Sequence, residues 1–392
     1  MKQFRNYLVM GLILLAQICI SQIKVSPYSY PQFLTKERGQ IYELWNTYLE
    51  KKSANDTTAA NLWYPTEVNE FSNFDILESS SGFTPSLYQL PITNTLLYLK
   101  KLNSSTYKIT SLFYWLGEQD KLNIFLISNV LAKIDKGNLY LSNYLLYETR
   151  TWVNKKVGKI NYHYYPEYDF NQKEAEKANE TVENINALFS LDNGEIDYYI
   201  ASDCDEKNKI IGIDYKVTTG VTEECAFFDK KNNIIYTTQH GGENHKHELI
   251  HLINKKFPKA HFLLLSGLSV YSNNRNVHIG HSLEECMKIL NDNLKSNTNL
   301  ITNFYDKFPT LKDLNDEIIQ ADYFYGAVLV DLILEKGGMK LLIDALKTVE
   351  NDDELKKFIN KNLDIDESNI DSIIRKKVSE LADENFRPKI IL

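Results

Sequence analysis

The feature that most constrains this chain is a change in the spacing of its apolar residues near residue 171. Before that point, four runs rich in Ile, Tyr, Phe and Leu have the composition of β-strands. These runs cover residues 107–115, 122–134, 139–154 and 159–165. Lys136, Gly137 and Asn138 separate two of them with a typical hairpin turn. The pattern therefore predicts an N-terminal unit built on an antiparallel sheet, with one amphipathic helix over residues 37–49 ahead of it.

From Asn171 onward the apolar residues follow a helical period, which continues to Phe189. We expect strands at 196–201 and 234–238, and then mainly helices. The expected helices cover residues 262–271, 283–294, 318–335 and 340–346. The fold class is therefore α+β, with predicted domains at 22–160 and 161–300 and a helical C-terminal subdomain at 301–392.

Composition excludes several classes of protein. With 43% hydrophobic and 24% charged residues, the chain of 392 residues can bury a core of ordinary size. A formal net charge of −8 offers no basic surface, so nucleic acid is not an expected partner. Histidine is unevenly distributed: seven of the eight lie between His240 and His281. An even spread would place about one histidine there.

The first 21 residues are typical of a secretory signal. Lys2 and Arg5 precede an apolar stretch of 14 residues, and cleavage is expected between Ser21 and Gln22. A lipid anchor at Cys19 is the less favoured alternative, because Gln17 and Ile18 are poor residues before an acylated cysteine. No later segment reaches the roughly 20 apolar residues of a membrane span. We therefore expect a secreted or periplasmic protein with no span after signal removal.

The predicted mature chain keeps three cysteines. In an oxidising compartment, Cys204 and Cys225 could close a loop and leave Cys286 unpaired. Three independent thiols are the alternative, since the sequence does not place the two Cβ atoms within bonding reach.

The strongest chemical signal is the segment His247-Glu248-Leu249-Ile250-His251, which has the pattern H-E-x-x-H. On a helix, residues four apart share one face, so both imidazoles can bind the same ion. Zinc held in this way lowers the pKa of a bound water to about 7, and the intervening glutamate can accept its proton. The motif therefore predicts a zinc site that hydrolyses a carbonyl compound.

Together with two later blocks, this motif resembles the gluzincin metallopeptidases, and within them the peptidase-MA-like family. Leu265-Ser-Gly-Leu-Ser-Val-Tyr271 is similar to the family's Leu-x-Glu-Gly-Leu-Ala-x-Tyr helix. Ala321-Asp-Tyr-Phe-Tyr-Gly326 resembles its Tyr-x-x-Gly helix, whose tyrosine binds the transition-state oxyanion. The resemblance covers about residues 160–350 and implies a thermolysin-like domain.

The resemblance also implies roles for individual residues. His247 and His251 match the zinc ligands, and Glu248 matches the general base. Tyr323 matches the oxyanion tyrosine, with Tyr325 as a close competitor. The implied function is a secreted zinc metallopeptidase acting on a peptide or protein substrate.

One position departs from the family pattern. The third zinc ligand is the glutamate of the Glu-Gly pair, whereas this chain has Ser266 before Gly267. A serine hydroxyl supplies neither the charge nor the strong oxygen donor of a carboxylate. Five nearby residues could replace it, namely His261, His278, His281, Glu284 and Glu243. Glu285 is less attractive, because with Ser282 it has capping-box spacing.

Two other outcomes stay open. In one, the site binds metal weakly and is catalytically impaired; in the other, it has lost metal altogether. In the second case the chain would be a non-catalytic binding or surface-interaction protein on a degenerate peptidase scaffold.

Overall fold

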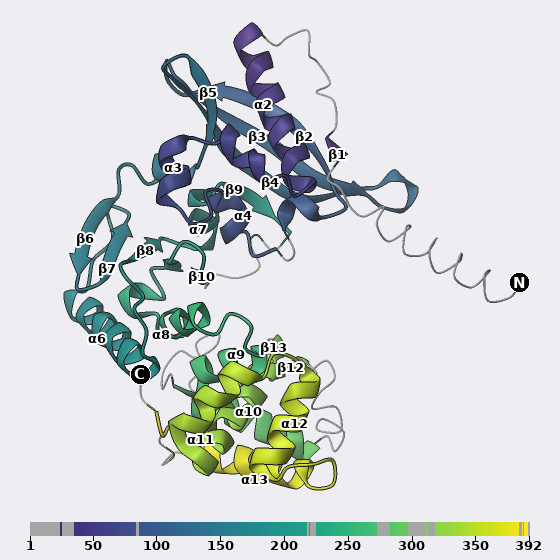
Figure 1. Ribbon diagram of the computed structural model, residues 1–392, viewed down its shortest axis with the longest axis vertical. Helices are drawn as coiled ribbons and strands as arrows, with labels where there is room; N and C mark the ends of the chain where they lie inside the picture. The colour runs from purple at the N-terminus through teal and green to yellow at the C-terminus, as the bar shows by residue number, and fades with distance from the viewer. Residues whose placement is uncertain are drawn as a thin grey trace, which may run out of the picture. The chain divides into compact units, whose positions relative to one another are not determined.

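The computed structural model describes residues 24–25, 35–83, 86–217, 219, 225–272, 283–296, 310–312, 318–383, 386 and 388–390. The chain divides into two compact units. Unit 1 comprises residues 1–153, 163–168 and 200–225, and unit 2 comprises 154–162, 169–199 and 226–392. The described residues mix helices with antiparallel sheets, so the predicted α+β class is confirmed (Figure 1). The predicted domain boundaries stay predictions, and the signal segment with Cys19, Ser21 and Gln22 lies outside the described residues.

Unit 1 is built on a six-stranded sheet in the order β1-β2-β3-β4-β5, with β9 paired to β4. Its neighbours are antiparallel except for β1 and β2, which are parallel. The strands are β1 (Lys24–Val25), β2 (Thr93–Lys101), β3 (Thr106–Leu116), β4 (Leu122–Asp135), β5 (Asn138–Ser142) and β9 (Ile213–Lys216). The predicted hairpin turn joins β4 to β5, where Lys136 and Gly137 both have positive φ.

The helices of unit 1 place a cluster of large aromatic side chains in its core, including Trp45, Tyr48, Trp63 and Tyr88. They are α2 (Lys36–Ser53), η2 (Thr57–Leu62), α3 (Pro65–Glu70), α4 (Ile76–Ser80), η3 (Leu87–Gln89), η4 (Glu118–Asp120), α5 (Leu145–Glu148) and α7 (Cys204–Ile210). The expected helix at 37–49 lies within α2, because buried Ile41, Trp45 and Leu49 repeat at helical spacing.

The expected continuous strand over residues 139–154 is wrong for residues 143–152, which separate β5 from β6. The buried carboxylate of Glu67 accepts hydrogen bonds from the hydroxyl of Ser142 and the backbone N–H of Asn143. These contacts end β5, and the chain then forms α5 before β6 begins at Val153. Glu67 is far away in sequence, so the local pattern could not show this termination.

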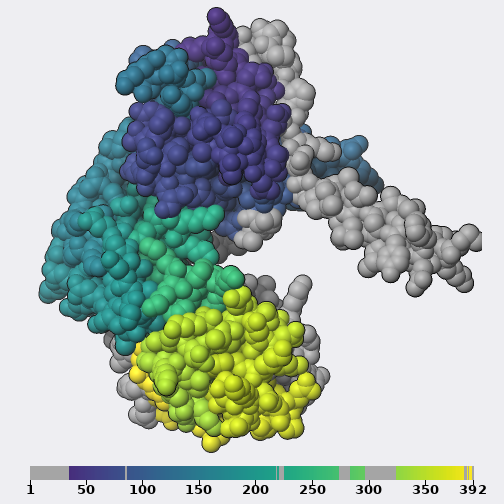
Figure 2. All heavy atoms as spheres, in the orientation of Figure 1, coloured from purple at the N-terminus to yellow at the C-terminus, as the bar shows by residue number. Residues whose placement is uncertain are grey.

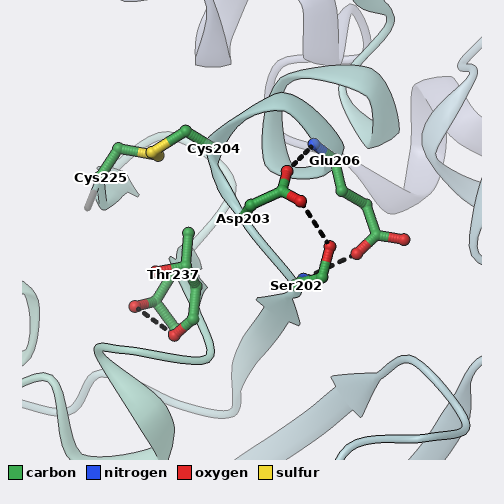
Figure 3. The surroundings of a disulfide bond; sticks show 7 residues. Ser202, Asp203, Cys204, Glu206, Cys225 and Thr237 are labelled. Carbon is green, nitrogen blue, oxygen red and sulfur yellow. Dashed lines mark hydrogen bonds between the residues drawn. A yellow bond between two sulfur atoms is a disulfide. The ribbon is translucent and has the colours of Figure 1, made fainter. Parts of the chain in front are cut away.

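Unit 1 also contains a disulfide between Cys204, at the start of α7, and Cys225, with Cα atoms 5.7 Å apart (Figure 3). Of the two alternatives for these cysteines, the structure has the bridged one. The helix that carries Cys204 is capped by Asp203, whose side chain accepts from Glu206 N–H, and the Glu206 side chain in turn accepts from Ser202 N–H. Cys286, in unit 2, is a free and buried thiol.

Unit 2 begins with a five-stranded sheet in the order β10-β11-β8-β7-β6. Its strands are β6 (Val153–Val157), β7 (Ile160–Tyr164), β8 (Ile196–Ala201), β10 (Phe227–Asp229) and β11 (Ile234–Thr238). Helix α6 (Gln172–Phe189) begins after Asn171, whose side chain accepts from the N–H groups of Lys173 and Glu174. The predicted change to a helical period therefore coincides with a capped helix.

The rest of unit 2 is mainly helical, and in Figure 2 its yellow C-terminal residues form one continuous surface. The elements are η5 (Gly242–Asn244), α8 (Lys246–Ile250), η6 (His251–Lys255), α9 (Phe262–Tyr271), α10 (Leu283–Ser296), β12 (Thr310–Lys312), β13 (Ile318–Gln320), α11 (Ala321–Thr348), α12 (Asp352–Leu363) and α13 (Ile370–Leu381). Within the described ranges, no helix has the length and apolar character needed to span a bilayer.

One detail of the helical prediction needs correction. Residues 318–320 pair with β12 as a strand, so the helix begins at Ala321 and not at Ile318. The prediction of two helices, at 318–335 and 340–346, is otherwise confirmed, because α11 consists of two helical segments that meet at the non-helical residue Gly338. Gly338 has φ 60°, a conformation that glycine adopts without strain.

Candidate metal centre

The H-E-x-x-H segment lies on a short helix of unit 2. Its first four residues belong to α8, and His251 begins the tighter η6 turn. Leu249 and Ile250 are fully buried and fix the orientation of this helix. His247 and His251 therefore lie on the same face, as their spacing predicts.

The two imidazoles meet at their Nε2 atoms, which are 3.2 Å apart. The ring centroids are separated by 4.8 Å and the ring planes are nearly perpendicular. Two ligand nitrogens on a tetrahedral zinc, each about 2.0–2.1 Å from the ion, lie about 3.3 Å from each other. The observed separation thus fits two ligands of one metal ion without side-chain rearrangement.

Burial keeps the nearby imidazoles neutral. It lowers the pKa of His251 to about 4, although a hydrogen bond with Asn254 opposes this shift. Burial also lowers the pKa of His245 to about 4, with a smaller contribution from the charge of His251. Neutral imidazole is the form that binds a metal, so near neutral pH His251 requires no deprotonation before it can bind.

Asn254 determines which nitrogen of His251 can act as a ligand. Its side-chain amide lies 3.3 Å from Nδ1 of His251, and its Oδ1 atom is buried with no hydrogen-bond partner among the described residues. Exchanging the amide oxygen and nitrogen, which are nearly indistinguishable in shape, lets Oδ1 accept from the Nδ1–H group. In that tautomer Nε2 directs its lone pair to the point shared with His247.

Glu248 lies on the same helix with its side chain 7% exposed. Its charge acts on the hydroxyl of Tyr198, whose pKa is raised well above its usual value mainly by burial. Glu248 is therefore a largely buried carboxylate on the short helix that also carries His247.

The sheet of unit 2 holds the loop that leads into this helix. Tyr198 in β8 donates a hydrogen bond to Gly242 O (2.8 Å) and accepts one from His245 N–H (3.1 Å). Tyr162 in β7 donates to Glu243 O (3.1 Å). Tyr198 and Asn254 were not among the site residues predicted from the sequence. Only Asn254 had a sequence signal, because it lies three residues after His251 on the same turn.

Three of the five residues proposed to replace the third ligand interact with other groups in the structure. His261 caps α9 through Nδ1, which accepts from Leu263 N–H, and its Nε2 pairs with Asp352. Glu243 accepts from the backbone N–H of Asn171 (2.6 Å), and Glu284 pairs with Lys288 within α10. His278 and His281, like Ser282 of the expected capping box, lie outside the described residues.

No set of three His, Cys, Asp or Glu side chains converges on one metal position within the part of the chain that the structure describes. The preformed part of the site thus consists of the two imidazoles of His247 and His251.

The second and third sequence blocks meet where α9 crosses α11. Ser266 is buried in α9, which also packs against α8 and η6. A Cβ on Gly267 would lie 2.6 Å from Gly326 Cα, so the two helix backbones are in direct contact at this crossing. These glycines are therefore required by packing, independently of any role in catalysis.

Of the two tyrosines considered for the oxyanion, Tyr323 lies in the first turn of α11, and its side chain falls outside the description. Tyr325 is 1% exposed. Burial raises its pKa to about 12, while Arg375 and Asp371 of α13 act on it in opposite directions. The hydroxyl of Tyr325 is therefore close enough to α13 to be affected by the charges of that helix.

Compared with protein-family models and with curated proteins, the chain gives no significant match.

Proposed function

We propose that this chain is a secreted zinc metallopeptidase of gluzincin type, with a thermolysin-like unit around the H-E-x-x-H helix. The observation that carries this proposal is the 3.2 Å separation of the His247 and His251 Nε2 atoms. The neutral state of His251 and the placement of Asn254 beside it add support. The Cys204–Cys225 disulfide is compatible with an oxidising compartment.

His247 and His251 would hold the zinc ion, which when bound acidifies water and polarises a substrate carbonyl. Glu248 accepts the proton that the attacking water loses and then passes it to the amine that leaves. The water oxygen first adds to the carbonyl carbon to give a tetrahedral species, and the C–N bond breaks when that species collapses and the leaving amine takes the proton. Tyr323 is the proposed hydrogen-bond donor to the oxygen of the tetrahedral species.

The test combines zinc analysis with hydrolysis of a quenched fluorescent peptide library. Purified protein should contain nearly one zinc per chain, and Glu248→Gln should retain the metal while kcat falls about 10²–10⁴-fold. Glu284→Gln is the matched control, because it changes a glutamate that pairs with Lys288 on α10. The proposal fails if the wild type takes up no zinc at micromolar supply, or if the Glu248 variant is fully active.

One observation favours the competing function, a non-catalytic binding protein. Ser266 stands where the resemblance expects a carboxylate. In that case Ser266→Glu should raise zinc affinity, whereas Ser266→Gln, of the same size but neutral, should not. An equal response of both variants would show that residue 266 does not face the metal position.

A further inference from the structure

His245, two residues before the H-E-x-x-H segment, is the imidazole adjacent to the His247–His251 pair. It lies at the junction of η5 and α8, where its backbone is not helical (φ −75°, ψ 81°). Its ring centroid is 6.4 Å from that of His247, and the charge of His251 acts on it. Three histidines therefore lie within seven residues, with the ring of His245 next to that of His247, although only two of them belong to the motif.

The side chain of His245 has an unused polar atom. Its Nδ1 is buried and has no hydrogen-bond partner among the described residues. A buried polar atom without a partner is unfavourable, and a metal ion bound at this position would satisfy it. Its backbone N–H, by contrast, is fixed by Tyr198.

The distance that His245 has to move is small. Two imidazoles bound through nitrogen to one tetrahedral zinc have ring centroids about 5.2 Å apart. The ring centroids of His247 and His251 are already 4.8 Å apart. The ring centroid of His245 lies 6.4 Å from that of His247, which is about 1 Å more than the separation expected for two ligands of one zinc ion. A change of the His245 side-chain rotamer is the movement by which it would approach the other two rings.

We propose that His245 is the third protein ligand of the zinc site, so that the site consists of three histidines and not of two histidines with a glutamate. This inference rests on the proposed function. Three histidines that leave a fourth position open are a known catalytic arrangement for zinc. They give the bound ion a higher net charge than a site containing a carboxylate, because all three ligands are neutral. Under this assignment the chain needs no acidic residue at position 266.

The first experiment measures zinc affinity by competition with a chromophoric chelator. We expect His245→Ala to weaken zinc binding by at least about 10-fold to 100-fold, the effect known for residues that only support a ligand. His240→Ala is the matched control, because His240 is exposed and lies in the loop before η5. It should leave the affinity unchanged.

The second experiment shows whether position 245 reaches the metal. A thiolate bound to Co²⁺ produces a charge-transfer absorption in the near ultraviolet that imidazole ligands do not produce. Cobalt-loaded His245→Cys should show this band, and His240→Cys should not. Cys204 and Cys225 are bonded to each other and Cys286 is buried, so the added thiol accounts for the signal.

The outcomes separate this inference from the proposed function. Zinc binding in the wild type that is equally tight in His245→Ala, with no charge-transfer band in His245→Cys, overturns the role of His245 alone. A wild type that binds no zinc overturns the proposed function together with it. If His245→Ala does not fold, the cobalt spectrum of the cysteine variant decides.

Discussion

Replacement of Gly267 by alanine tests how closely α9 and α11 approach each other. The new Cβ would lie 2.6 Å from Gly326 Cα and closer still to its carbonyl group, whereas ordinary contact begins at 3.4 Å. The nearest atom would be the carbonyl carbon of Gly326 at 2.2 Å, so the helices must separate by about 1.2 Å to reach ordinary contact. Both sides of the contact are backbone, so neither can rotate away as a side chain would.

The expected loss of stability follows from two opposing terms. Overpacking of this kind costs about 3 kcal/mol, the upper end of the usual range, because backbone yields least. Alanine recovers about 1 kcal/mol over glycine in a helix. The net cost of about 2 kcal/mol corresponds to a Tm lower by about 4–8 °C for a cooperative unit of 150–250 residues.

Differential scanning calorimetry measures this shift, and Gly39→Ala provides the control. Gly39 lies inside α2, and a Cβ there meets no atom within 4 Å. The same substitution should stabilise the protein by about 1 kcal/mol at that position. A Gly267→Ala protein that melts at or above the wild-type temperature would refute the proposed close crossing.

Two further predictions concern unit 1. Replacing both Cys204 and Cys225 by serine removes a covalent link between residues 21 positions apart. Urea denaturation should then give a free energy of unfolding lower by about 3 kcal/mol. Reduction of the wild-type disulfide should cause the same loss, and a wild type that keeps its stability in reducing agent would contradict this prediction. Burial, reinforced by the charge of a neighbouring glutamate, raises the pKa of Asp75 above 3.8, and its carboxylate accepts hydrogen bonds from Tyr48 and Tyr88. A proton then binds the folded state more tightly than the unfolded state, so wild type should gain stability relative to Asp75→Asn as pH falls from neutral towards 4. An unchanged difference between the two proteins over that range would show that Asp75 does not titrate there.

The sequence alone predicts those features that local geometry determines. The α+β class follows from the change in apolar spacing, and the hairpin turn at Lys136 and Gly137 follows from turn chemistry. The meeting of His247 and His251 follows from the period of the helix. Each of these depends on residues only a few positions apart, so the pattern contains the required information.

Features that depend on distant residues required the tertiary structure. β5 ends at Ser142 because Glu67 binds the chain there. His261 was a candidate ligand, but Asp352, which is 91 residues away, engages its Nε2. Its other ring nitrogen caps α9. A single imidazole has only two nitrogens, so these partners leave none for a metal.

The histidine cluster shows the same division most clearly. The sequence determined that a metal-binding pair should form, because a helix turn brings residues four apart together. Tertiary structure decided which other side chains stand near that pair, because Tyr198 accepts a hydrogen bond from His245 N–H and donates one to Gly242 O, and so positions the loop around His245. A ligand set needs three groups at one point in space, and sequence spacing determines only the two that share a helix.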